Sequence, residues 1–373
     1  MTEKKSITSR QLITLIVLFL FGSSVVVGVN INSDVGQDSW LSLIFSFIFS
    51  IPAVLIISRI IILFPKKNIY EIFDEVFGKK IGKILNLLFV IHILYLGSIV
   101  LRNFSEFVEI TTLSDTPPLP VMLSLILIVV YLSKSNIEIL ARWGPVCLTI
   151  IMITVTFTIM LSAPVIDFNY IKPILGHNFM QMTKSSFSIF MVPFSQIIVF
   201  LGLADFFEIK GKEKKTYLTG IIITGLLLLT VLIRNIMVLG APLLKDTFFS
   251  SYEAARILRL GEFLTRIEGV ITINFILAGI TKITVFAIVL AKGLAHLSKN
   301  QDYKKLVVPA CLLILAICPF LFENIMDMFD FAPIFGMLSI PIQVILPITI
   351  WIIAECKKKN NLQNQKYNLK LNY

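Results

Sequence analysis

The sequence predicts an all-α integral membrane protein with ten membrane-spanning helices. Its 373 residues are 56% hydrophobic and 15% charged, with a mean hydropathy of +0.88, whereas soluble domains are roughly 45–50% apolar. Apolar runs of about 20 residues, the length that crosses a bilayer, recur between Leu12 and Trp351. We therefore expect a single membrane domain over 1–355.

The first apolar run, 12–31, follows a basic N-terminus but is too long for a signal-peptide core and lacks a small-residue cleavage site. It should stay in the protein as the first spanning helix. The eighth run begins at Gly269 or as early as Glu262, and the fourth is short. The predicted helices are 12–31, 40–63, 84–104, 118–132, 143–161, 185–204, 217–239, 269–290, 306–322 and 332–351.

Lysine and arginine gather in alternate connections between these helices, which predicts the orientation of the chain. One side receives the clusters 66–67, 79–83, 210–215, 304–305 and 357–359, whereas the other holds Asp34, Asp38, Glu106, Asp115, Glu323, Asp327 and Asp330. Positive connections stay in the cytoplasm. Both termini should therefore be cytoplasmic, and the Asn-, Gln- and Lys-rich segment 356–373 should be a disordered tail.

Several function classes receive no support. The net charge of +10 lies in short orientation clusters between apolar runs, so we expect no nucleic-acid partner. The histidines His92, His177 and His296 are far apart, and the four cysteines show no metal-binding spacing. We expect no catalytic residues, no metal and no cofactor, so the chain is not predicted to be an enzyme. Cys356 is either a free thiol or a palmitoylation site.

Two predicted helices carry backbone breakers at corresponding depths. Gly22-Ser23-Ser24 interrupts the first helix, and Val192-Pro193-Phe194 interrupts the sixth. Interrupted helices at matching places in two five-helix halves are typical of inverted-repeat transporters with a mid-membrane ligand site. We therefore predict repeats over 11–162 and 184–355. A half-helix N-terminus suits a carboxylate and free carbonyls suit an amine, so an amino acid fits both.

A charged residue inside an apolar run costs free energy in lipid, so its presence there suggests a functional role. Lys282 lies well inside the eighth helix. Its ammonium either replaces a coupling cation or binds interior carbonyls, or the side chain snorkels to the cytoplasmic interface. The sequence leaves these alternatives open.

Short motifs along nearly the whole chain resemble the spore germination permeases, the B subunits of nutrient germinant receptors. They include Ile7-Thr8-Ser9-Arg10-Gln11-Leu12 with Phe21-Gly22-Ser23, Asp38-Ser39-Trp40-Leu41, Phe64-Pro65 with Glu71, Gly78-Lys79 and Gly82-Lys83, Thr116-Pro117, Glu138 with Ala141-Arg142, and Gly261-Glu262-Phe263 with Arg266-Ile267-Glu268. The resemblance implies the amino acid, polyamine and organocation transporter superfamily, with a LeuT-like five-plus-five fold. It also implies an amino acid or nucleoside germinant, a receptor A subunit, a lipoprotein C subunit and the spore inner membrane.

If that fold carries over, the two helix breaks and the midpoints of helices three and eight should line the ligand pocket. The expected ligand-binding residues are Gly22, Ser23, Ser24, Val25, Tyr95, Ser98, Leu101, Met191, Pro193, Phe194, Asn274 and Leu277, with Lys282 as a substitute for a cation. Such a pocket is mostly apolar, which suits a small neutral amino acid.

Three functions remain open at this point. The leading hypothesis is a sensor whose occupancy shifts the conformation of the bundle and signals to partner subunits. The alternative is a proton- or sodium-coupled amino acid transporter, which would share the same fold and pocket. A purely structural subunit would tolerate bulky residues at both helix breaks.

Overall fold

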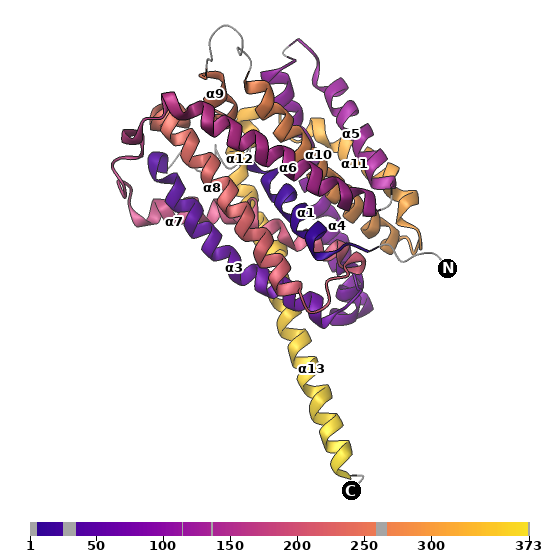
Figure 1. The fold of residues 1–373 in the computed structure, drawn as a ribbon. Helices are drawn as coiled ribbons and strands as arrows, with labels where there is room; N and C mark the ends of the chain where they lie inside the picture. The colour runs from indigo at the N-terminus through magenta and orange to yellow at the C-terminus, as the bar shows by residue number, and fades with distance from the viewer. Residues whose placement is uncertain (1–5, 25–34, 114, 136, 259–266, 372–373) are drawn as a thin grey trace.

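The computed structural model describes residues 6–24, 35–113, 115–135, 137–258 and 267–371, with side chains up to residue 359. These residues form a helical bundle from which one long helix protrudes (Figure 1). The β pairing of the described residues is an isolated bridge between Ile7 and Phe207. The chain is therefore an all-α protein.

Within the described part of the chain, eight segments are long and apolar enough to cross a membrane, at 36–63, 69–111, 137–165, 179–206, 213–245, 268–297, 303–320 and 325–359. The first and fourth predicted spans correspond to shorter apolar helices, α1 (Ser9–Phe21) and α5 (Pro118–Lys134). The remaining α-helices are α3 (Ser39–Leu63), α4 (Ile69–Thr111), α6 (Ile137–Ser162), α7 (Phe179–Met191), α8 (Glu213–Lys245), α9 (Ser250–Arg256), α10 (Glu268–Leu297), α11 (Val307–Ile317), α12 (Ile325–Ile340) and α13 (Leu346–Leu371). The 3₁₀ or π segments are η1 (Gly36–Asp38), η2 (Ala163–Val165), η3 (Phe168–Ile171), η4 (Phe194–Phe206), η5 (Tyr303–Leu306), η6 (Cys318–Phe320) and η7 (Pro341–Ile345).

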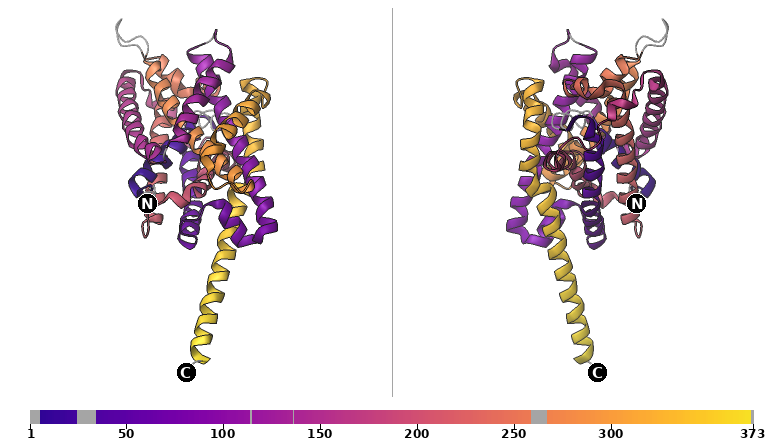
Figure 2. Two further views of the ribbon diagram at one scale, coloured as in Figure 1. Left: turned by 90° about the vertical axis from the view of Figure 1, so that its right-hand side faces the viewer. Right: turned by 90° about the vertical axis from the view of Figure 1, so that its left-hand side faces the viewer.

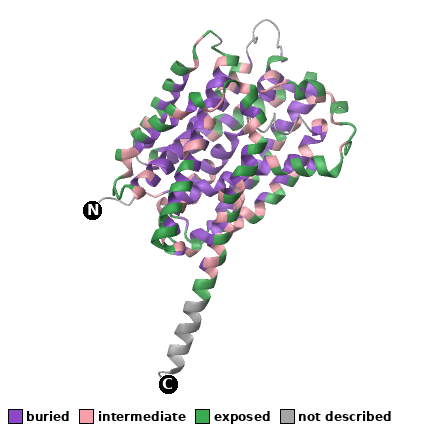
Figure 3. Ribbon diagram, turned by 180° about the vertical axis from the view of Figure 1, so that it is seen from behind, coloured by how far each residue is buried: buried purple, intermediate pink, exposed green. Residues whose placement is uncertain are grey.

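Helix α10 and the segment formed by α7 and η4 make up the centre of the bundle. Each is 83% buried over its most apolar stretch, compared with 28% for α6. Helix α10 contacts α1, α4, α5, α6 and α11. Figure 3 shows the resulting pattern, with buried residues inside the bundle and exposed ones on its outer helices. The outer helices therefore present their apolar side chains to lipid.

Helix α4 begins earlier than the sequence predicts. Asn68 caps it, because its side-chain oxygen accepts the backbone N–H groups of Tyr70 and Glu71 at 3.1 and 3.2 Å. Gly78 then interrupts the helix with φ of 79°. The first turns, up to residue 77, form a separate amphipathic segment that buries Tyr70 and Phe73. Hydropathy missed this segment because its other face is charged.

Helix α13 includes residues 356–371 of the segment for which the sequence predicts a disordered tail. Helix α13 continues without interruption to Leu371 and extends away from the bundle in both side views (Figure 2). After Pro347 the segment contains neither glycine nor proline, the residues that most often end a helix. The spanning helix therefore propagates past the last apolar residues.

Candidate functional site

The two predicted helix breaks are confirmed. Helix α1 ends at Phe21 and is followed by a turn in which Ser23 N–H donates to Leu20 at 3.0 Å. Helix α7 ends at Met191, Val192 is extended with φ of −140°, and η4 begins at Phe194. Both breaks lie inside the bundle, where a polar backbone group can find a partner.

A small cavity lies beside both breaks. Its volume is about 50 Å³, below the roughly 300–1,000 Å³ of typical ligand pockets. Its walls come from the end of α1, from α4, from the break before η4, from α10 and from α12. The lining residues are Gly22, Ser23, Leu96, Ile99, Val100, Asn103, Phe104, Val192, Gln196, Lys282, Phe322, Met328, Phe331, Ala332 and Phe335.

Lys282 joins the two breaks across this cavity. Its ammonium donates to Ser23 Oγ, at the end of α1, and to Gln196 Oε1, in the first turn of η4, the latter at 2.8 Å. It also lies 4.9 Å from the centroid of the Phe19 ring, a cation–π distance. Lys282 is 1% exposed. The side chain therefore points into the bundle and does not reach toward either end of α10.

Gly22 permits this close approach. A Cβ atom at this position would lie 3.1 Å from the carbonyl oxygen of Ala278 and 3.1 Å from Cδ of Lys282. Both contacts are tighter than most packing contacts of a Cβ atom. A glycine at this position therefore lets the break in α1 approach helix α10 without displacing Lys282 or the α10 backbone.

A second polar chain starts one residue before Gln196. Ser195 Oγ donates to Gln343 Oε1, and Gln343 Nε2 lies 3.0 Å from His92 Nε2. Gln343 is in the π segment η7, and the His92 ring stacks on Phe335 at 6.0 Å. Pairing within a bundle satisfies polar groups that lipid could not. This chain connects η4 to α4 and to the last spanning segment.

The cavity contains only some of the residues that the sequence nominates. Gly22, Ser23 and Lys282 line it together. The Ser24 hydroxyl is buried and has no hydrogen-bond partner among the described residues. Val25 lies outside the described residues.

The residues predicted on α4 do not line this cavity. Ser98 Oγ donates to the carbonyl of Ile314 at 3.1 Å, which places it against α11. Leu101 is fully buried, and Tyr95 packs on Phe335 at 5.2 Å. The cavity is lined instead by Leu96, Ile99, Val100, Asn103 and Phe104. A shift of one residue rotates a helix by about 100°, so the depth of a residue alone does not select the face of α4 that lines the cavity.

Apart from Lys282, the residues predicted on helices six and eight do not line this cavity either. Val192 and Gln196 line the cavity beside Met191, Pro193 and Phe194, which are themselves buried in the core or the break. Asn274 accepts from Thr154 Oγ1 at 2.5 Å and therefore faces α6. Leu277 is a partly buried packing residue of α10. The sequence missed Gln196 because it looks like an ordinary polar residue in an apolar run.

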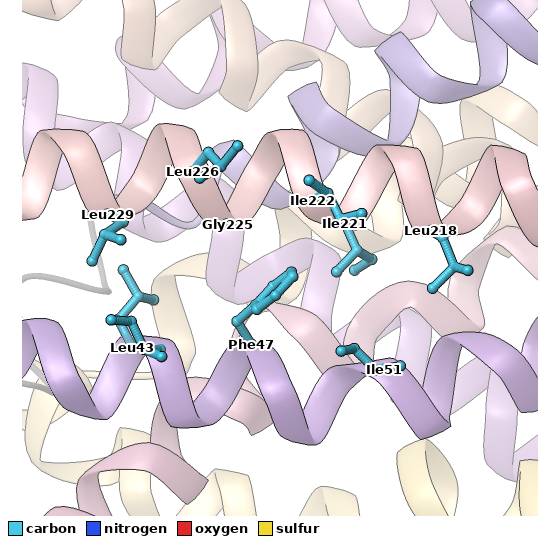
Figure 4. A pocket seen from close by; sticks show the side chains of 10 residues that line it. Leu43, Phe47, Ile51, Leu218, Ile221, Ile222, Gly225, Leu226 and Leu229 are labelled. Atoms are coloured by element: carbon cyan, nitrogen blue, oxygen red, sulfur yellow. The ribbon is translucent and has the colours of Figure 1, made fainter.

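A larger, apolar hollow lies on the outer surface between α3 and α8 (Figure 4). Its volume is about 360 Å³, and aliphatic residues together with Phe47 and Gly225 line it. Leu226 at its rim is 61% exposed. Since no polar side chain is among its lining residues, it has nothing to orient a nutrient. In a bilayer this groove would contact acyl chains.

Known proteins resemble this chain over most of its length. Spore germination protein KB of Bacillus subtilis (strain 168) is 24% identical over 364 residues, which cover 96% of each chain. Spore germination protein A2 of the same organism is 25% identical over 69% of this chain and 70% of its own. The crystal structure of MhsT in complex with L-phenylalanine has a TM-score of 0.61 and 13% identity, covering 94% of this chain and 99% of that one.

These similarities have different weights. At 13% identity, the MhsT comparison establishes the fold alone, a LeuT-like membrane fold with broken first and sixth helices. The spore germination protein family matches residues 6–327, far more than half of the chain. The chain is therefore a multi-pass membrane protein that belongs to the spore germination protein family.

Proposed function

We propose that this protein is the nutrient-sensing membrane subunit of a spore germination receptor and that its ligand is a small neutral amino acid. The observation that carries this proposal is the position of Lys282. Its ammonium bridges Ser23 and Gln196, one at each helix break, beside a mid-bundle cavity. A ligand that reaches this point meets the two elements that broken-helix transporters use for binding.

The chemistry of the cavity favours an amino acid. The Lys282 ammonium and the Ser23 hydroxyl can donate to a carboxylate, and the Gln196 and Asn103 side chains supply acceptors for an amine. The other walls are aliphatic or aromatic, including Phe104, Phe331 and Phe335. The structural neighbour MhsT was crystallised with L-phenylalanine, an amino acid with an apolar side chain. Nucleosides would need more polar edges than these walls present.

Binding requires a rearrangement, which is the basis of sensing. A cavity of about 50 Å³ is too small for most amino acids, so α12 or the Lys282 side chain must move. If the ligand carboxylate accepts hydrogen bonds from the Lys282 ammonium, the bonds of this ammonium to Ser23 and Gln196 would break. The two halves of the bundle would then be free to shift, and occupancy would favour a second conformation.

The family resemblance extends the proposal to partners and location. We infer a complex with a receptor A subunit and a lipoprotein C subunit in the spore inner membrane, with both termini in the cytoplasm. The charge asymmetry of the connections supports this orientation. Helix α13 protrudes from one end of the bundle, which in this orientation is the cytoplasmic end (Figure 2). It offers a surface for such partners.

The second candidate is an amino acid transporter. It is favoured by the fold and by the same lysine, since a fixed ammonium beside a broken helix can take the place of a coupling cation. A transporter and a sensor differ in net flux, not in the pocket.

The test uses spores in which this protein is the B subunit of the only receptor, exposed to a panel of amino acids and nucleosides. We expect a response to a neutral amino acid and no accumulation of that amino acid in vesicles that contain the protein. Accumulation against a gradient would instead establish the transporter. Germination by nucleosides alone would refute the proposed ligand class.

A further inference from the structure

A second polar cavity lies at the end of the bundle from which α13 leaves. It has a volume of about 440 Å³. It lies between the amphipathic first segment of α4, the spanning part of α4, and the last turn of α10. Lys357 of α13 donates to the carbonyl of Val76 at 3.0 Å, which places the cavity beside the start of the protruding helix. Its polar lining residues are Asp74, Lys79, Lys83, Asn86, His296 and Lys299.

The positive charge of this cavity is not neutralised from within. Lys79, Lys83 and Lys299 line it and are exposed. Asp74 is the single acidic residue in the lining, and it is already engaged. One of its oxygens accepts from Asn86 Nδ2 at 3.2 Å, and the other lies 2.8 Å from His296 Nε2. The cavity therefore presents three ammonium groups to an anion.

Asn86 adds a buried acceptor. The residue is 1% exposed, and because its nitrogen is used by Asp74, its oxygen Oδ1 has no partner among the described residues. A buried acceptor without a partner is unusual in a protein. It suits a ligand that brings a hydroxyl group as well as a negative charge.

An apolar stripe leads directly away from the lysines along the outer face of α4. Ile84, Leu87 and Ile91 lie at helical spacing above Lys80 and Lys83, and they are 61%, 50% and 53% exposed. In a membrane protein such side chains face lipid. The cavity is thus at the depth of the headgroups, with a path for an acyl chain above it.

We propose that this cavity binds the headgroup of an anionic phospholipid, with the phosphate at Lys79, Lys83 and Lys299 and a headgroup hydroxyl donating to Asn86 Oδ1. Phosphatidylglycerol has both groups. Basic pockets between spanning helices on the cytoplasmic side are a known way to bind such headgroups. The site is separate from the nutrient cavity, and it holds together the α4 and α10 segments next to α13.

The test is retention of lipid by the purified full-length protein, measured by native mass spectrometry after incubation with phosphatidylglycerol or phosphatidylcholine. The variant K79Q/K83Q/K299Q removes the three ammonium groups, and K210Q/K212Q/K215Q removes as many exposed charges from another connection on the same side. The variant K79R/K83R/K299R keeps the charge. All are compared as folded monodisperse protein.

We expect phosphatidylglycerol adducts, with few phosphatidylcholine adducts, in the wild type, the control variant and the arginine variant. Removal of the three pocket lysines should weaken phosphatidylglycerol retention by about tenfold or more, because each ammonium near an anionic surface contributes appreciably. An equal loss of phosphatidylglycerol retention in the control variant would show that the lysines attract anionic lipid only through general surface charge. That result would overturn the proposed site. Displacement of the lipid by millimolar inorganic phosphate, with equal thermal stabilisation by phosphate alone, would show a free-phosphate site instead.

Discussion

Lys282 is the residue on which the proposed site depends. Its ammonium is buried among Ser23, Gln196 and the Phe19 ring. A charge in the middle of a bilayer is retained only where it is paired or functional. Among the described residues, two neutral oxygens and an aromatic face hold this ammonium. A ligand carboxylate would be a stronger partner than either oxygen.

We therefore predict that Lys282→Met sharply weakens the nutrient response. A hydrogen bond to a charged group is worth about 1.5–3 kcal/mol, so the nutrient concentration for half-maximal germination should rise by roughly tenfold or more. Lys245→Met, at an exposed lysine near the end of α8, is the matched control and should respond normally. An unchanged nutrient response in Lys282→Met would show that the Lys282 ammonium does not bind the nutrient.

At this scale the sequence was informative for some residues only. Gly22, Ser23 and Lys282 could be predicted because helix breakers and buried charges stand out in an apolar run. Gln196, Asn103 and Phe335 could not, because their roles depend on which face of a helix meets the cavity. That face is decided by packing between helices far apart in sequence.

Close packing between η4 and α10 fixes the relation of the two breaks. Gly202 of η4 faces Val289 of α10, and a Cβ atom there would lie 2.6 Å from Val289 Cγ1. Val289 is β-branched and stiff, so it cannot move aside easily. The carbonyl of Val289 also accepts from the Tyr70 hydroxyl at 2.8 Å, which ties the amphipathic start of α4 to the same point.

Gly202→Ala should therefore destabilise the protein by about 1–3 kcal/mol through overpacking. The measurement is thermal unfolding in detergent. The companion change Val289→Ala removes the clashing methyl groups, so the double variant should lose less stability than the sum of the single variants. Gly269→Ala is the control, since a Cβ atom there meets nothing within 4 Å. Strict additivity would show that the two helices do not pack as described.

The π segment η7 gives a second prediction for an element. Gln343→Leu would leave His92 Nε2 without its partner, whereas Ser195 Oγ keeps its bond to the Met191 carbonyl; the change should cost about 1–3 kcal/mol. Adding His92→Phe removes the orphaned nitrogen, and the double variant should recover part of the lost stability. The check is the same unfolding experiment, and a double variant worse than the sum would contradict the polar chain. The sequence did not predict this segment, because a π turn is not visible in hydropathy.

The fold class and the order of the spanning helices are those that the sequence predicts. They could be predicted because the thickness of a bilayer sets the length of each apolar run. The breaks at 22–23 and 192–193 were also predictable. The amphipathic start of α4 and the helical continuation of α13 were not. Both have mixed composition, so their structure follows from neighbouring elements and not from a local pattern.

Orientation is tested by the natural thiols. Cys147, Cys311 and Cys318 are buried and Cys356 is exposed, and all four are free. A membrane-impermeant maleimide should therefore label one site per folded chain in detergent. In right-side-out vesicles Cys356 should stay unlabelled until the membrane is opened, whereas a cysteine introduced at Lys245 should be labelled at once. Labelling of Cys356 in intact vesicles would reverse the proposed topology.

The most direct test of the central claim is equilibrium binding of neutral amino acids to the purified protein and to its Ser23→Leu variant. Ser23 is 3% exposed at the break, and leucine there would fill the cavity and displace the ammonium of Lys282. Ser124→Leu, at an exposed position on α5, is the matched control. We predict saturable binding in the wild type and in Ser124→Leu, and none in folded Ser23→Leu. Equal binding in all three proteins would contradict a nutrient site between the two broken helices.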